Sequence, residues 1–174
     1  VFYNHGNAED LNSIQDYLQE LSKELFVDIV SWDYAGYGLH KTMDDVKPTE
    51  QNVYDDAQTV FDYVVVQNLP IVIWGRSLGS APAIHVSVNN QEIIIGMIVE
   101  SGFLSIARVV SERLHSIWDE FDNEQFIKHQ KMIPTLFVHG KQDHVVPFEH
   151  GEKLFDLCPC DQKECFWIAN GHHN

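Results

Sequence analysis

Short apolar runs alternate with longer amphipathic segments along the whole chain. A run of β-branched and aromatic residues between turn signals is typical of a buried strand, and apolar positions three or four residues apart are typical of a helix. The runs predict strands over Val1–Asn4, Val27–Trp32, Ile71–Trp74, Ile93–Val99, Thr135–Val138 and Glu164–Ile168. The amphipathic segments predict helices over Asp10–Leu25, Gln51–Gln67, Ser80–His85 and Phe148–Leu157, with an irregular helical segment over Phe103–Gln130.

This alternation of strand and helix predicts an α/β fold with a mostly parallel sheet and helices on both faces. The length of 174 residues and the 44% hydrophobic content are enough for one core and too little for two ordinary domains. We therefore expect a single domain over residues 1–174. The chain begins at Val1 inside an apolar run and ends at Asn174 directly after a loop, so we expect it to be truncated at both ends.

Charge and cysteine content limit the partners and the cellular compartment that we expect for this protein. Eleven basic and 26 acidic side chains give a net charge of −15, which repels the phosphates of nucleic acids and anionic bilayers. No apolar run reaches the roughly 20 residues that cross a membrane, and no signal peptide opens the chain. The three cysteines, Cys158, Cys160 and Cys165, lie together in an odd number, which favours reduced thiols over a disulfide or zinc framework. These features predict a cytoplasmic protein without a nucleic-acid partner.

The most informative motif is Gly75-Arg76-Ser77-Leu78-Gly79. It follows an apolar run and precedes a helix-compatible segment, which is the setting of a nucleophile elbow. Gly75 and Gly79 allow the strand to turn at once into a helix, and the turn exposes the hydroxyl of Ser77. We therefore predict that Ser77 is a catalytic nucleophile.

A second motif, His5-Gly6-Asn7-Ala8, follows the first strand and predicts an oxyanion hole. The charge that develops on a carbonyl oxygen attacked by Ser77 needs two preorganised backbone N–H donors. We assign them to Leu78, which follows the nucleophile, and to Asn7. The alternative is an ordinary glycine turn in which Asn7 caps the following helix.

An acid and a base are also expected in the order Ser, Asp, His along the chain. Asp143 lies in the loop after the apolar run Thr135–Val138, and we predict that it orients the histidine. Glu100, at the end of another strand, is a rival for this role. For the general base we choose His172, directly after Gly171, over its neighbour His173. His5, His40, His85, His115 and His139 are expected to be surface or packing residues.

Apolar residues are dense in the segment between Glu100 and Pro134, which is too short for a large lid domain. They either pack a helix onto the sheet or line a groove for an acyl chain. These residues are Ile106, Val109, Val110, Leu114, Ile117, Trp118, Phe121 and Phe126.

These motifs together resemble the Bem46-like branch of the α/β-hydrolases, which includes the α/β-hydrolase domain-containing proteins 17 and 13. The resemblance covers nearly the whole chain and rests on residues 5–11, 33–38, 47–50, 75–79 and 139–146. It implies an α/β-hydrolase fold, a serine hydrolase with the triad Ser77, Asp143 and His172, and removal of palmitate from protein cysteines as a candidate activity. The chain departs from the branch in the longer loop Leu39–Val46, which we expect near the site, and in the extra histidine of residues 171–174.

We therefore expect hydrolysis of acyl esters or thioesters through an acyl-enzyme on Ser77, with no metal or organic cofactor. The substrate would be an acylated small molecule or an acylated protein, and peripheral membrane association would come from segments outside this chain. Two alternatives remain open. One is a non-catalytic binding or scaffold protein with the same fold, and the other is a serine peptidase.

Overall fold

The computed structural model describes residues 1–39, 48–110 and 120–174. Within these residues six strands form one sheet in the order β2-β1-β3-β4-β5-β6, and every neighbouring pair is parallel. The strands are β1 (Phe2–Asn4), β2 (Val30–Ser31), β3 (Ile71–Arg76), β4 (Ile94–Glu100), β5 (Thr135–Gly140) and β6 (Lys163–Ile168). The described helices are α1 (Leu11–Leu25), α2 (Glu50–Val65), α3 (Ser80–Asn89), α4 (Ile106–Val110), α5 (Asn123–Ile127) and α6 (Phe148–Leu157).

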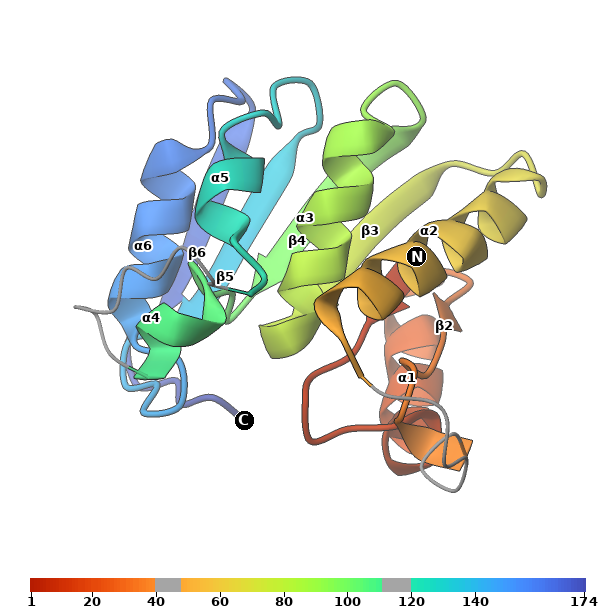
Figure 1. The fold of residues 1–174 in the computed structure, drawn as a ribbon, viewed down its shortest axis with the longest axis horizontal. Helices are drawn as coiled ribbons and strands as arrows, with labels where there is room; N and C mark the ends of the chain where they lie inside the picture. Colours follow the sequence, from red (N-terminus) through yellow and green to blue (C-terminus); the bar gives the residue numbers. More distant parts are fainter. Residues whose placement is uncertain (40–47, 111–119) are drawn as a thin grey trace.

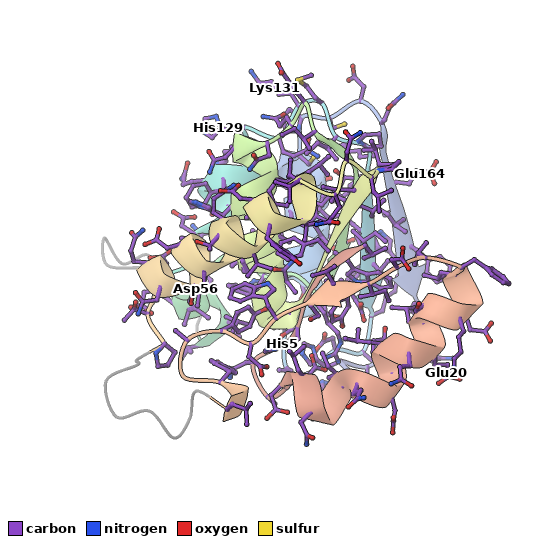
Figure 2. All side chains as sticks on the ribbon, turned by 90° about the vertical axis from the view of Figure 1, so that its right-hand side faces the viewer. His5, Glu20, Asp56, His129, Lys131 and Glu164 are labelled. Carbon is purple, nitrogen blue, oxygen red and sulfur yellow. The ribbon has the colours of Figure 1, made fainter. Side chains whose placement is uncertain are left out.

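Helices cover both faces of the sheet, as the sequence predicts, but unequally. Figure 1 shows α2, α3, α5 and α6 side by side in front of the strands, and Figure 2 shows α1 on the opposite side from α2 and α3. The core lies mainly between the sheet and the larger helical layer. Its largest fully buried side chains include Phe2, Phe61, Ile73, Ile84, Met97 and Phe137.

Side-chain caps fix the starts of the two longest helices. Asp10 precedes α1, where it accepts a hydrogen bond from the backbone N–H of Ser13 while the Ser13 hydroxyl accepts one from Asp10 N–H. This reciprocal capping box satisfies donors that a helix start leaves unpaired. Thr49 caps α2 by accepting from Asn52 N–H. Asp10 therefore has the capping role that Asn7 would have had in the simple-turn interpretation.

The central strands bring the site together. In β3 the side chains alternate between buried and half-buried positions, as expected for a strand covered on both faces. Since the strands are parallel, their carboxyl ends meet at one edge of the sheet. The loop after β1, the turn after β3 and the loops after β5 and β6 therefore all open at that edge, and Figure 1 places the C-terminal end of the chain near the start of α3.

Two predicted elements are shorter than expected. Residues 27–32 yield only the two-residue strand β2, because this strand lies at the sheet edge and pairs only with the three-residue β1. Within residues 103–130 the described helices are α4 and α5, each of five residues. The expected loop over Leu39–Val46 falls largely on residues 40–47, and His40, Leu114, His115, Ile117 and Trp118 also lie outside the described residues.

Candidate active site

The nucleophile elbow has the strained geometry that its sequence predicts. Ser77 has a φ of +51°, a left-handed conformation that is unfavourable for a residue with a Cβ atom. A Cβ on Gly75 would lie 2.4 Å from the carbonyl oxygen of Gly79, and a Cβ on Gly79 would lie 2.0 Å from that of Asn4. Both glycines are therefore required for the turn to pack against β1 and α3.

Three side chains from separate loops form a continuous hydrogen-bonded relay. His173 Nε2 lies 3.1 Å from Ser77 Oγ, and His173 Nδ1 lies 2.8 Å from Asp143 Oδ2. In the tautomer that donates Nδ1–H to the carboxylate, Nε2 is the acceptor for a hydrogen bond from the Ser77 hydroxyl. This is the geometry expected of the nucleophile, base and orienting acid in a serine hydrolase triad.

Asp143 is held as a carboxylate by its surroundings. Burial by itself raises the pKa of this carboxyl, but hydrogen bonds from His173 and from the backbone N–H groups of Val146 and Val145 outweigh it and lower the pKa below its usual value. Both backbone donors lie 2.8 Å from Oδ1, which leaves Oδ2 for the imidazole. The Asp143 side chain is fully buried, so little water competes for these bonds.

The choice of His172 as the general base is wrong in this geometry, because its neighbour His173 occupies the relay. The turn Ile168–Gly171 is fixed against the loop after β5, where Gln142 N–H donates to Gly171 O at 2.9 Å. His172 Nδ1 then lies 3.0 Å from Gln142 O, with the side chain exposed. The next residue, His173, reaches Ser77 instead. The extra histidine of the sequence motif is thus His172.

The rival acid Glu100 has other partners. Its Oε2 accepts from Trp74 Nε1 at 2.9 Å, and its Oε1 lies 3.4 Å from Arg76 Nε. Burial raises the pKa of this carboxyl, while Arg76 and the Trp74 hydrogen bond oppose the increase. Asp143, and not Glu100, is the carboxylate that lies beside His173.

The predicted oxyanion residues lie next to the nucleophile. Asn7, Ser77 and Leu78 line one cavity of about 340 Å³. The turn that carries Asn7 is fixed on both sides, because Gly6 N–H donates to Glu9 Oε2 at 2.6 Å and His5 O accepts from Tyr34 OH at 2.6 Å. The Asn7 side-chain oxygen accepts from Tyr37 OH, which fixes the position of the Asn7 side chain.

The same cavity is mostly apolar. Its lining includes Tyr37, Pro48 and Glu120 and seven aliphatic or aromatic residues: Val53, Phe103, Ile106, Val109, Phe121, Val145 and Val146. Three members of the predicted acyl groove, Ile106, Val109 and Phe121, therefore reach the site. Two others do not: Val110 is 78% exposed, and the Phe126 ring packs on Tyr54 and His85.

Two contributors to the site were not predicted from the sequence. Arg76 joins the histidine loop to Glu9, and Tyr37 holds Asn7. The position of Arg76 in the sequence, between Gly75 and Ser77, is the feature that could have indicated its role in the site. Tyr37 comes from a distant loop, and nothing local in the sequence connects it with Asn7.

Within residues 1–39, 48–110 and 120–174, no group of three His, Cys, Asp or Glu side chains is arranged to hold a metal ion. The helices in these ranges are all too short or too polar to span a bilayer. Cys158 and Cys160 are buried free thiols, and Cys165 is an exposed one. The expectation of a cofactor-free site stays a prediction.

Comparison with known proteins agrees with this fold. Residues 1–123 match the Hydrolase_4 family, described as "Serine aminopeptidase, S33". The Caenorhabditis elegans alpha/beta hydrolase domain-containing protein aho-3 is 29% identical over all of this chain and 52% of its own length. The human alpha/beta hydrolase domain-containing protein 17B is 28% identical over all of this chain and 60% of its own length.

The fold is shared with solved structures as well. A monoacylglycerol lipase from Paleococcus ferrophilus superposes with a TM-score of 0.72 at 16% identity, over 99% of this chain and 85% of that one. The chain spans 52–66% of the length of the two curated relatives above and of a third one. The family match covers well over half of the chain, and the chain therefore belongs to the Hydrolase_4 family of α/β hydrolases.

Proposed function

We propose that this protein is a serine hydrolase that cleaves acyl esters or thioesters through an acyl-enzyme on Ser77. The observation that carries the proposal is the relay from Ser77 Oγ to His173 Nε2 at 3.1 Å and from His173 Nδ1 to Asp143 Oδ2 at 2.8 Å. His173 would take the hydroxyl proton as Ser77 attacks the carbonyl carbon, and would then give that proton to the departing alcohol or thiol. Water activated by the same histidine would release the acid and restore Ser77.

Stabilisation of the tetrahedral intermediate is assigned to two backbone N–H groups. Leu78 follows the nucleophile in the elbow, and Asn7 lies on the turn after β1. Such donors are aimed at the oxygen on which charge develops, and removing one from a serine hydrolase typically lowers kcat by about 10²–10³-fold. Ionised Asp143 would stabilise the imidazolium that forms at the same moment.

The cavity supports an acyl group as the recognised part of the substrate. Its volume of about 340 Å³ is at the lower end of the range of small-molecule sites, roughly 300–1,000 Å³. Its side chains are mainly aliphatic and aromatic, and Ser77 and Asn7 are among the few polar residues that line it. The resemblance to the Bem46-like branch adds thioester-linked palmitate on a protein as the finer proposal, with a cytoplasmic location as its natural setting.

The first test is active-site labelling with a fluorophosphonate probe. We expect modification at Ser77, identified by mass spectrometry, and loss of the label in Ser77→Ala. Absence of labelling in a sample whose circular dichroism shows a folded protein would contradict the proposal and favour the non-catalytic scaffold.

Acyl-chain preference tests the role of the cavity. Val109 lines the cavity, whereas its neighbour Val110 is 78% exposed and does not. We expect Val109→Phe to lower kcat/KM for an octanoyl ester at least 10-fold more than for an acetyl ester, because the larger ring fills the space for the chain. The matched control Val110→Phe should leave the ratio unchanged. Equal turnover of the two esters by the unmodified protein would contradict the proposal that this cavity binds the acyl chain.

A serine peptidase is a second candidate, because of the family description and one feature of the cavity. Glu120 is the only acidic residue among the described residues that line it, and a carboxylate there could pair with the amino group of a peptide. Release of nitroaniline from an aminoacyl p-nitroanilide faster than ester cleavage, with loss in Glu120→Gln, would favour the peptidase over the esterase.

A further inference from the structure

Arg76, the residue before the nucleophile, makes contacts that the triad does not explain. It is the last residue of β3, and its side chain is only 12% exposed. Its guanidinium contacts groups from three other parts of the chain: the turn after β1, the end of β4 and the loop after β6. Because Arg76 is bonded directly to Ser77, these contacts connect the two loops and the end of β4 to the nucleophile.

One arm of this network reaches the loop that carries the general base. Arg76 Nη2 donates to the backbone carbonyl of His173 at 3.0 Å and also bonds Asn174 Oδ1. A hydrogen bond to the carbonyl of the base itself restricts the position of its backbone, and with it the origin of the imidazole. The imidazole then needs only its Asp143 bond to fix its rotation.

A second arm reaches the turn assigned to the oxyanion hole. Arg76 Nη1 bonds Glu9 Oε1, and the other oxygen of that carboxylate accepts from Gly6 N–H at 2.6 Å. Gly6 immediately precedes Asn7, whose N–H is the proposed donor. Glu9 thus transmits the position of the guanidinium to the oxyanion turn.

The third contact holds the guanidinium itself in place. Glu100 Oε1 lies 3.4 Å from Arg76 Nε, and Glu100 Oε2 accepts from Trp74 Nε1 at 2.9 Å. Trp74 lies two residues before Arg76 on the same face of β3 and packs against Tyr3 of β1. The fork of five donors in a planar guanidinium can serve these partners together, which a lysine ammonium cannot.

We propose that Arg76 is a positioning residue that holds the His173 loop and the Asn7 turn in register with Ser77. The proposal rests on the function proposed above, because it concerns the same triad. A displacement of about 1 Å in such a site can cost on the order of 10²-fold in rate. Arg76 therefore acts on catalysis indirectly, by positioning His173 and the oxyanion turn. Its loss is expected to lower kcat.

The test compares Arg76→Gln and Arg76→Lys with a matched control. Lys163 Nζ also donates to two backbone carbonyls, Phe155 O and Cys158 O at 2.7 Å each, but it lies at the start of β6, at the opposite end of the strands from Ser77. On a short-chain p-nitrophenyl ester, we expect Arg76→Gln to lower kcat by about 10–100-fold with KM changed by less than about threefold. Arg76→Lys should recover little of this loss, and Lys163→Gln should keep kcat while lowering thermal stability.

A background without the base separates positioning from general damage. In His173→Ala, the arm through the histidine no longer matters, so adding Arg76→Gln should reduce the residual rate by only a few-fold. An unchanged kcat in Arg76→Gln, or an equal additional loss with and without His173, would overturn the inference. If Arg76→Gln does not fold, the same measurement is made on Arg76→Lys and Glu9→Gln. A wild-type kcat in both of these variants would overturn the inference.

The two proposals fail in different ways. If the unmodified protein is not labelled at Ser77 and cleaves no ester, the proposed function fails and the positioning role fails with it. If the protein is labelled and active while the Arg76 variants keep kcat, only the positioning role fails.

Discussion

At the scale of single residues, the site shows what a motif can and cannot specify. The spacing of Gly75, Ser77 and Gly79 predicts a strained elbow because only glycine fits where a Cβ would meet a backbone oxygen at 2.0–2.4 Å. The choice between His172 and His173 depends on which way a loop turns, and contacts with Gln142 and Gly140 decide that. Those contacts are distant in sequence, so the motif alone could not distinguish the two histidines.

The two histidines give a direct prediction. His173→Ala should lower kcat/KM on the order of 10³-fold, because it removes the proposed general base, whereas His172→Ala should stay within about threefold of the unmodified protein. Steady-state hydrolysis of a p-nitrophenyl ester by both variants measures this. The opposite ranking would return the base to His172 and require the loop after β6 to adopt another conformation.

At the scale of elements, strands and helices with many tertiary partners were predicted best. Helix α6 spans Phe148–Leu157, as its periodicity predicts, because its apolar stripe packs on β5 and on Trp167 of β6. The edge strand β2 was overestimated because its apolar residues lack a second neighbouring strand. The helix boundaries within residues 103–130 could not be predicted from the sequence, because the apolar residues there are too dense to show one periodicity.

The junction of the elbow with β1 makes a prediction at this scale. A methyl group on Gly79 would lie 2.0 Å from Asn4 O and 2.7 Å from His5 O, so β1 and the start of α3 must separate. We expect Gly79→Ala to destabilise the protein by about 1–3 kcal/mol, the usual cost of overpacking, and to lower kcat because Ser77 and the Asn7 turn move apart. Urea denaturation and ester hydrolysis measure the two effects.

A matched control for this variant is Gly96→Ala. Gly96 lies in β4, and a Cβ there would have its nearest contact at an ordinary 3.6 Å. This variant should keep kcat near that of the unmodified protein. A kcat loss of similar size in both variants would contradict a local effect at the elbow.

At the scale of the whole molecule, buried titratable groups connect the site to global stability. His139 is 1% exposed, and its Nε2 lies 3.0 Å from Val146 O and 3.3 Å from Asp143 Oδ2. Burial lowers the pKa of this imidazole, against the Val146 hydrogen bond and the attraction of Asp143, which raise it. His139 is therefore neutral in the folded protein at pH values where an exposed imidazole begins to protonate.

This difference sets the sign of a pH dependence. An unfolded imidazole binds its proton near pH 6.5, and the folded His139 does so only at lower pH. Below about pH 6.5 the unfolded state binds more protons, so the free energy of unfolding falls as the pH falls and is fully restored above that range. His139→Gln removes this linkage, and its urea midpoint should change less between pH 7.5 and 5.5 than that of the unmodified protein. Equal slopes would contradict a neutral buried His139.

The placement of the triad within the sheet has a consequence for how the protein loses activity. Ser77 follows the central strand β3, whereas His173 follows β6, which lies at the edge and pairs only with β5. Phe166 and Ile168 of β6 are 62% and 42% exposed. Edge segments open at a lower free energy than central strands, so β6 can detach while the elbow is still folded. Under rising denaturant, enzyme activity would therefore disappear before the bulk of the secondary structure, which makes catalysis a sensitive reporter of fraying at this one edge.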